Sequence, residues 1–135
     1  MDHNNILAVV LAGGRSKRFG RDKSQVKLGD KILIDYILTE IIDLYKDILI
    51  VTNEPIKFLN SDKISVINDV KKGLGPLGGV FSAMRWARHH KENYKWISTF
   101  PIDTPFFKKE HLIKFYKEIN SDKSNLFFMK SKNTR

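Results

Sequence analysis

The 135-residue sequence contains no cysteine, which excludes disulfide bridges, thiolate metal ligands and thiol nucleophiles. It also has no uninterrupted apolar run of about 18 residues or more, the length that a membrane-spanning helix requires. The first residues, MDHNN, lack the basic stretch and the apolar segment of a secretory signal peptide. From these absences we expect a cytoplasmic protein with no membrane partner.

Common catalytic and nucleotide-binding signatures are missing as well. No serine lies in a Gly-x-Ser-x-Gly turn. The glycine-rich segment 11–24, LAGGRSKRFGRDKS, matches neither the Gly-x-Gly-x-x-Gly fingerprint nor the spacing of a P-loop. His3 is terminal, and His89 and His90 fall at the expected end of a helix, where surface positions are the simplest interpretation. Any chemistry would therefore depend on positioning, charge and metal.

Positive charge, in contrast, is abundant: the chain carries a formal net charge of +9, which favours anionic partners. Residues 13–31 hold seven basic and two acidic side chains, and residues 108–135 hold eight basic and three acidic ones. The second cluster lies along a segment with helical spacing, so we interpret it as a solvated face. The first cluster lies in a glycine-rich loop and is the stronger candidate for an anion site.

Apolar patterning predicts alternating strands and helices. Short, continuously apolar or β-branched runs predict strands, at residues 5–12, 47–53, 63–68 and 94–100, with a further strand starting in 125–129. Helical spacing predicts helices over residues 32–45, 76–90 and 108–119. This order is typical of one α/β domain with a mainly parallel sheet. Such sheets bind ligands beyond the carboxyl ends of their strands.

The loop after the first expected strand has the chemistry of a phosphate site. Gly13 and Gly14 allow a ligand to approach the backbone closely and to accept hydrogen bonds from it. Lys23 supplies a point charge, and Arg15 or Arg18 can bind two phosphate oxygens at once. An exposed turn is the alternative interpretation of the same residues.

Polar or small residues also follow the later strands. Asp103, between two prolines, either caps its own turn or binds Mg²⁺, which prefers carboxylate oxygens and bridges to substrate phosphates. Asp69 is a weaker candidate of the same kind, and Asn53 either belongs to a turn or contacts the polar edge of a ligand. The segment 75–79, GPLGG, either only begins a helix or leaves a flat slot for a base.

The sequence resembles the molybdenum cofactor guanylyltransferases in five segments with the same order and spacing: LAGGRSKRFGRDK, IVTN ending at Asn53, the region of Asp69, GPLGG and FPIDTP. Phe19 stands where this family usually has methionine. The resemblance implies a Rossmann-like three-layer sandwich with a mainly parallel central sheet, of the nucleotide-diphospho-sugar transferase type. It also implies transfer of GMP from GTP to molybdopterin-bound molybdenum, with release of pyrophosphate.

The resemblance assigns roles to individual residues. Lys23, Arg18 and Asp103 would be catalytic, and Asp103 would hold Mg²⁺. The substrate would be bound by Leu11, Ala12, Gly13, Gly14, Arg15, Lys23, Asn53, Asp69, Gly75, Pro76, Leu77 and Gly78. Asn53 and Asp69 would contact the guanosine part. GTP and the molybdopterin cofactor would be the partners, without nucleic acid, and we expect a monomer that contacts the machinery for molybdenum cofactor insertion.

The family continues beyond a position like Arg135, so we expect residues 1–135 to form a single nucleotidyltransferase domain that is truncated at its C-terminus. Two alternatives remain open. A CTP- or sugar-phosphate-using nucleotidyltransferase of the same superfamily would use the same loop and Asp103. A non-catalytic basic module that binds nucleotides or RNA would account for the net charge, and it predicts strongly salt-dependent RNA binding.

Overall fold

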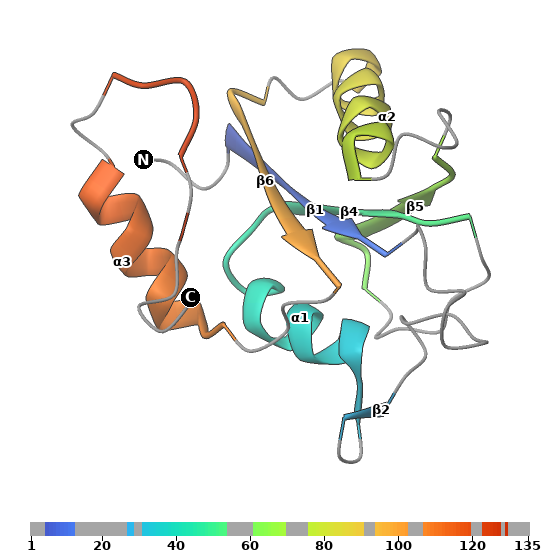
Figure 1. The fold of residues 1–135 in the computed structure, drawn as a ribbon, viewed down its shortest axis with the longest axis horizontal. Helices are drawn as coiled ribbons and strands as arrows, with labels where there is room; N and C mark the ends of the chain where they lie inside the picture. The colour runs from blue at the N-terminus through green and yellow to red at the C-terminus, as the bar shows by residue number, and fades with distance from the viewer. Residues whose placement is uncertain are drawn as a thin grey trace.

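The computed structural model describes residues 5–12, 27–28, 31–53, 61–69, 76–90, 94–102, 107–119, 123–127 and 129. Its main sheet has four strands in the order β5-β4-β1-β6, and every pairing between them is parallel. The strands are β1 (Ile6–Leu11), β4 (Asp47–Val51), β5 (Ile64–Ile67) and β6 (Trp96–Pro101). Helix α2 (Pro76–His89) lies on one side of this sheet, and α1 (Leu33–Ile41) lies on the other (Figure 1).

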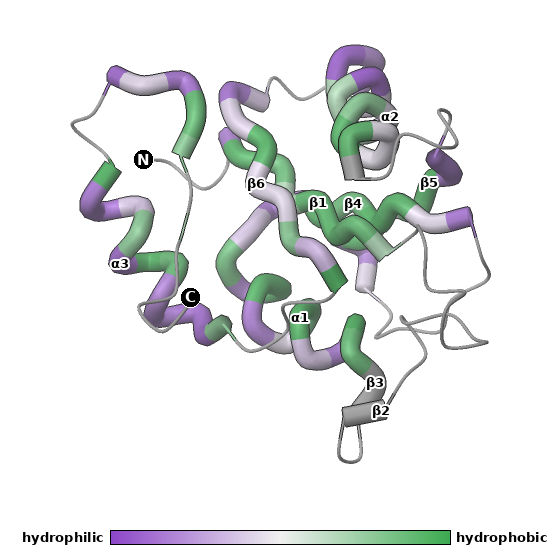
Figure 2. The backbone as a smooth tube through the Cα atoms, viewed as in Figure 1, coloured by the Kyte–Doolittle hydropathy of each residue, from purple (hydrophilic) through white to green (hydrophobic). Residues whose placement is uncertain are grey.

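The two central strands are apolar, apart from Asp47 at the start of β4, because helices cover both of their faces. Along β1, alternate side chains point to opposite sides of the sheet. Ile6, Ala8 and Val10 join the core beneath α1, and Leu7 and Val9 join the core beneath α2. Figure 2 shows the resulting concentration of hydrophobic residues along β1 and β4. The three layers confirm the expected Rossmann-like α/β fold with a mainly parallel sheet.

Helices α1 and α3 (Lys109–Ile119) contribute to the larger core, which we call the α1–α3 layer. Its fully buried α1 side chains recur at helical spacing, and they are Ile34, Ile37, Leu38 and Ile41. Leu112 and Tyr116 supply the buried stripe of α3. The apolar residues of α2 and the opposite sheet face form a smaller core, the α2 layer, which includes Ala83 and Trp86.

A hydrogen-bonded trio joins α3 to the sheet inside the α1–α3 layer. The hydroxyls of Tyr45 and Tyr116 bond to each other, and Tyr116 Oη donates to Ser98 Oγ at 3.1 Å. Burial raises the pKa of both phenols above the ordinary value near 10, since a phenolate would lose its hydration. The trio therefore satisfies polar atoms in the core with uncharged groups.

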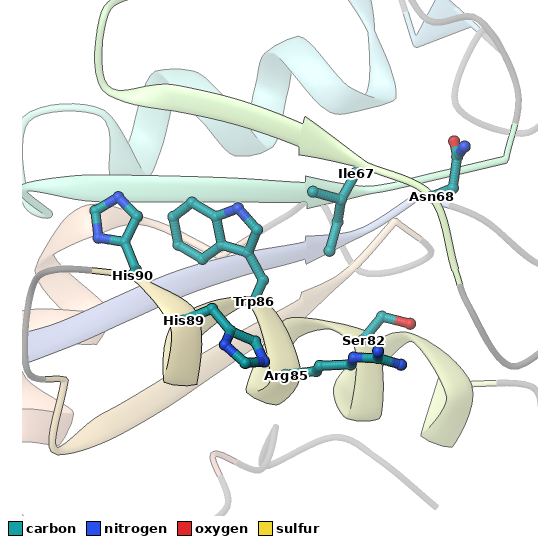
Figure 3. Close-up of a pocket in the computed structure, with 7 residues that line it drawn as sticks. All are labelled: Ile67, Asn68, Ser82, Arg85, Trp86, His89 and His90. Atoms are coloured by element: carbon teal, nitrogen blue, oxygen red, sulfur yellow. The ribbon is translucent and has the colours of Figure 1, made fainter.

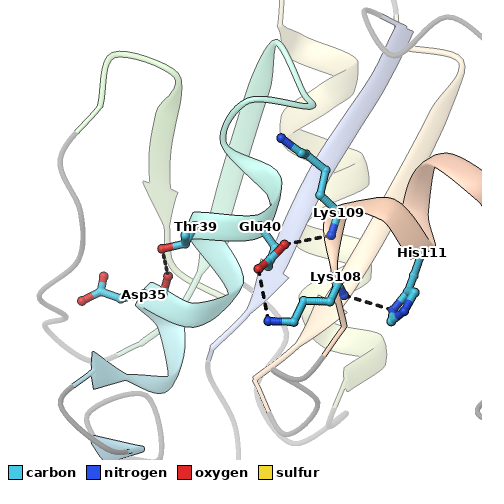
Figure 4. A network of polar contacts seen from close by, with 6 residues as sticks. All are labelled: Asp35, Thr39, Glu40, Lys108, Lys109 and His111. Atoms are coloured by element: carbon cyan, nitrogen blue, oxygen red, sulfur yellow. Dashed lines mark hydrogen bonds and ion pairs between the residues drawn. The ribbon is translucent and has the colours of Figure 1, made fainter.

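The start of α3 is fixed by Glu40 of α1 (Figure 4). Glu40 Oε2 accepts a hydrogen bond from the Lys109 backbone N–H at 2.8 Å, and Oε1 lies 3.8 Å from Lys108 Nζ. The backbone N–H of Lys108 donates to His111 Nδ1 at 3.1 Å. Side chains thus satisfy two backbone donors at this helix end, as capping residues do.

Most expected elements are confirmed, with shifts of a few residues at their ends. The helix expected over 32–45 ends at Ile41, because Leu44 and Tyr45 close a turn on the Ile41 carbonyl at 3.0 and 3.3 Å. An unexpected antiparallel hairpin pairs β2 (Lys27–Leu28) with β3 (Lys31–Ile32). The two residues between these strands, Gly-Asp, are a hairpin-turn signal that sequence reasoning overlooked.

The strand expected to start in 125–129 is wrong, because the described residues of that segment form no strand. The ring of Phe127 packs against Trp96 at a centroid distance of 5.7 Å, whereas Leu126 is 70% exposed. Apolar residues in this segment therefore make a side-chain contact with β6 without ladder pairing. No helix in the described part of the chain is long and apolar enough to span a bilayer.

Candidate functional site

The four strands of the main sheet end level with one another. Their last residues lie in register, and they are Pro101, Leu11, Val51 and Ile67. The ladder continues for one more residue, since the Ala12 N–H donates to the Val51 carbonyl at 3.0 Å and the Ile102 N–H donates to the Leu11 carbonyl at 3.2 Å. The segments that carry the predicted site residues therefore leave the sheet from neighbouring, fixed points.

Asn53 and Asp69 lie together where β4 and β5 end. The Asp69 backbone N–H donates to Asn53 Oδ1 at 3.0 Å, although the two residues are 16 positions apart. Just before Asn53, the Thr52 N–H donates to the Ile67 carbonyl at 3.0 Å. These two bonds join the loops after adjacent strands and set the orientation of the Asn53 amide.

Ser82 connects this pair to α2. Its Oγ lies 3.2 Å from Asp69 Oδ1 and 3.0 Å from the Gly78 carbonyl, and its side chain is only 2% exposed. Sequence reasoning missed this residue, because one serine within a helix resembles many others. A usable signal was its position four residues after Gly78, where a serine hydroxyl can bond back to the helix carbonyl.

The first turn of α2 packs directly against the ends of β1 and β4. A Cβ on Gly79 would lie 2.8 Å from Leu11 Cδ2 and 3.8 Å from Val51 Cγ1, so the glycine permits this close approach. Gly78 is buried beside it, and Leu77 is 73% exposed at the rim. Pro76 is the first residue of the helix, as its lack of an N–H favours.

A groove of about 390 Å³ continues from this network between β5 and α2 (Figure 3). It is lined by Ile67, Asn68, Ser82, Arg85, Trp86, His89 and His90. The Trp86 ring stacks on His90 at a centroid distance of 4.4 Å. Tyr94, which follows the helix, donates to Asp47 Oδ2 at 2.6 Å. The described lining of the groove contains the apolar side chain of Ile67 and the Trp86 ring, and it contains no acidic residue.

The described residues thus include part of the predicted site. Leu11, Ala12, Asn53, Asp69, Leu77 and Gly78 lie at the carboxyl edge of the sheet, with the backbone of Pro76. The other predicted residues lie outside the described part of the chain, and they are Gly13, Gly14, Arg15, Arg18, Lys23, Gly75 and Asp103. Among the described residues, no group of three or more His, Cys, Asp or Glu side chains could hold a metal ion.

This chain is similar in sequence to known proteins. Residues 8–135 match the model of the MobA-like NTP transferase domain. A probable molybdenum cofactor guanylyltransferase of Halalkalibacterium halodurans is 36% identical over 114 residues, which are 82% of this chain and 55% of that protein. The chain spans about half the length of the curated relatives it matches.

Solved nucleotidyltransferases have a similar fold. The molybdopterin-guanine dinucleotide biosynthesis protein A of Archaeoglobus fulgidus aligns with a TM-score of 0.55 and 25% identity, over 87% of this chain and 57% of that one. A 2-C-methyl-D-erythritol 4-phosphate cytidylyltransferase of Francisella tularensis aligns with a TM-score of 0.68 and 23% identity, over 89% of this chain and 54% of that one. With the family model matching nearly its whole length, the chain belongs to the MobA-like NTP transferase domain family.

Proposed function

We propose that this protein transfers GMP from GTP to the molybdopterin-bound molybdenum cofactor and releases pyrophosphate. The observation that carries the proposal is the joining of Asn53, Asp69 and the first turn of α2 at the carboxyl edge of the sheet. That edge is where parallel α/β sheets bind nucleotides. The names of the curated relatives support the guanylyl donor and the molybdenum cofactor acceptor.

The Asn53–Asp69 pair suits recognition of guanine. A guanine presents two adjacent donors, N1–H and the N2 amino group, and a carboxylate has two oxygens with which it can accept both. Adenine presents a ring acceptor in place of N1–H, so a fixed carboxylate opposes it. A site that accepts a hydrogen bond from a substrate N–H strongly rejects an analogue that lacks this N–H. The reason is that the polar group of the site is then left without its partner.

The triphosphate would lie over the segment that follows β1. Ala12 holds the start of that segment through its bond to Val51, and Gly13, Gly14, Arg15, Arg18 and Lys23 follow in sequence. Their backbone N–H groups and cationic side chains suit phosphate oxygens. In our proposal Lys23 and Arg18 neutralise the charge that develops on the leaving pyrophosphate.

Mg²⁺ would be held by Asp103. This carboxylate directly follows Ile102, whose N–H is bonded to the Leu11 carbonyl, so Asp103 and the phosphate-binding segment depart from adjacent strands. A hard carboxylate oxygen next to substrate phosphates is the donor set that Mg²⁺ favours. The bound ion would neutralise phosphate charge.

The reaction is a single displacement at phosphorus. A terminal phosphate oxygen of the acceptor attacks the α-phosphorus of GTP, the bond to the β-phosphate oxygen breaks, and pyrophosphate carries away the electron pair. The protein residues bind and orient the two substrates, which is the main requirement of such transfers.

We propose that the protein acts as a cytoplasmic monomer and contacts the machinery for molybdenum cofactor insertion.

Pyrophosphate release from GTP, Mg²⁺ and molybdopterin-bound molybdenum tests the proposal. Lys23→Ala and Asp103→Ala should each lower turnover by about a hundredfold or more, the scale of removing one preorganised charged contact. Lys17→Ala, a matched loss of positive charge in the same segment, should change it little. Near-wild-type turnover by both of the first two variants, with folding intact, would contradict the assignment.

A further inference from the structure

Apart from the tyrosine pair, Ser82 and Thr52 are the buried residues with a polar side chain among those that the structure describes. It lies on α2, next to buried Gly78, Gly79 and Ala83. A buried hydroxyl destabilises a protein unless it is hydrogen-bonded, so the identity of its partners indicates why the site holds a serine rather than an alanine.

Two partners of Ser82 belong to the predicted nucleotide site. Its Oγ lies 3.2 Å from Asp69 Oδ1 and 3.0 Å from the Gly78 carbonyl. A hydroxyl has one proton, which it donates to one of these acceptors at a time, and a bond to an ionised carboxylate is the stronger of the two. Through the Asp69 N–H, the same network reaches Asn53 Oδ1 at 3.0 Å.

We propose that Ser82 is a positioning residue that sets the preference of this site for guanine, an inference that rests on the proposed function. The terminal torsion of an aspartate side chain has broad minima, so the backbone alone does not fix the carboxylate plane. The Ser82 hydroxyl holds one carboxylate oxygen and thereby directs the group toward the base.

Without the Ser82 hydroxyl, the Asp69 carboxylate would stay in the site, but Ser82 would no longer hold its orientation. Ser82 also lines the groove between β5 and α2, so water from the groove could replace the hydroxyl at Asp69. A carboxylate that rotates and is hydrated accepts less well from N1–H and the N2 amino group together. The predicted phosphate ligands, Lys23 and Arg18, are not altered, so base preference should fall more than catalysis.

The test measures dissociation constants of GTP and ATP, each with Mg²⁺, by isothermal titration calorimetry on the full chain. In Ser82→Ala the preference for GTP over ATP should fall about tenfold, the value of one hydrogen bond of roughly 1.4 kcal/mol. In the transfer assay the KM for GTP should rise while kcat changes less than threefold, on the order of 0.6 kcal/mol. Ser82→Thr keeps the hydroxyl and should restore most of the preference.

Ser98→Ala is the control, since it removes a different serine hydroxyl, which is partly buried and bonded to Tyr116. It should lower the melting temperature without changing the ratio of the two dissociation constants. Equal weakening of GTP and ATP in Ser82→Ala, or an unchanged ratio, overturns the inference. A wild-type protein without preference for GTP overturns the proposed function and this inference together, whereas a wild-type preference that Ser82→Ala retains overturns the inference alone.

Discussion

The sheet face beneath α1 and α3 buries large side chains, whereas the face beneath α2 meets mostly small ones. In α1 the inward positions are leucine or isoleucine with no exposed surface, such as Ile37 and Leu38. In α2 the buried positions are Gly78, Gly79, Ser82 and Ala83. Three large apolar residues of α2 face outward, since Leu77, Phe81 and Met84 are 73%, 44% and 56% exposed, and Trp86 is the large side chain that packs partly buried against the sheet.

The α1–α3 layer therefore contributes mainly to stability, whereas the α2 side of the sheet carries the predicted binding site. The free energy gained by burial scales with the apolar area removed from water, so the α1–α3 layer supplies more of it. The small residues in α2 gain less free energy from burial, but they allow its first turn to approach the ends of β1 and β4 closely. On the same helix, Ser82 contacts both the Gly78 carbonyl and the predicted base-binding carboxylate of Asp69.

The largest expected effect is on stability. Ile37→Ala should lower the free energy of unfolding by about 2–5 kcal/mol, because it leaves a cavity in the α1–α3 layer. Met84→Ala on the outward face of α2 should lower it by less than about 0.5 kcal/mol. Urea unfolding followed by circular dichroism measures both. Equal losses in the two variants would remove the distinction between the layers.

The second prediction concerns a residue that should affect binding more than stability. Asp69→Ala should weaken GTP binding by about 10- to 100-fold, the value of hydrogen bonds to a charged group, while stability changes little. Asp62→Ala removes the same charge from an exposed turn and serves as the control. Calorimetric titration with GTP and Mg²⁺ gives both affinities. If the two variants bind GTP equally, Asp69 does not read the base.

The third prediction concerns pH and the tyrosine pair. Burial raises the pKa of Tyr45 and Tyr116 in the folded protein, so above the ordinary pKa of about 10 the unfolded chain releases protons that the folded chain keeps. The contribution of the two phenols to the free energy of unfolding is therefore complete below pH 10. It is lost as pH rises further, by up to about 1.4 kcal/mol per pH unit for each phenol.

Tyr45→Phe removes one of these protons, so its free energy of unfolding should fall less steeply above pH 10. Guanidinium unfolding at several alkaline pH values, compared with wild type, measures the slope. Identical slopes in the two proteins would show that the buried phenol does not control alkaline stability.

The smallest expected effect is at the start of α3. Glu40→Ala should lower the free energy of unfolding by about 1 kcal/mol, because the Lys109 N–H loses its acceptor. Glu40→Gln keeps an acceptor oxygen and should lose less, and Glu118→Ala on the exposed side of α3 is the charge-matched control. A loss in Glu118→Ala as large as in Glu40→Ala would indicate that charge, not the cap, is responsible.

Much of the fold could be predicted because the central strands have few alternatives. Continuous apolar runs such as ILAVVL in β1 and ILIV in β4 satisfy both faces of a covered strand. Boundaries were less certain, since Tyr45 keeps helical spacing yet lies beyond the end of α1. The strand predicted in 125–129 was wrong for a related reason. Apolar residues alone do not indicate whether a neighbouring strand is there to pair with.

The site was partly predictable by the same logic. Asn53 and Asp69 stand out because each follows a strand, and the structure joins them by a hydrogen bond. Ser82 does not stand out, because its role depends on a contact across 13 residues that spacing alone does not reveal. The roles of Lys23 and Asp103 rest on motif and family, so they stay predictions.

The most direct test of the account is the thermal stabilisation of the wild-type chain by GTP, CTP and ATP, each with and without Mg²⁺. A ligand that binds only the folded state raises the melting temperature according to its affinity. We expect GTP with Mg²⁺ to give the largest shift and GTP without the metal a smaller one. A larger shift with CTP or ATP, or no shift with GTP, would contradict a guanine site at the carboxyl edge of the sheet.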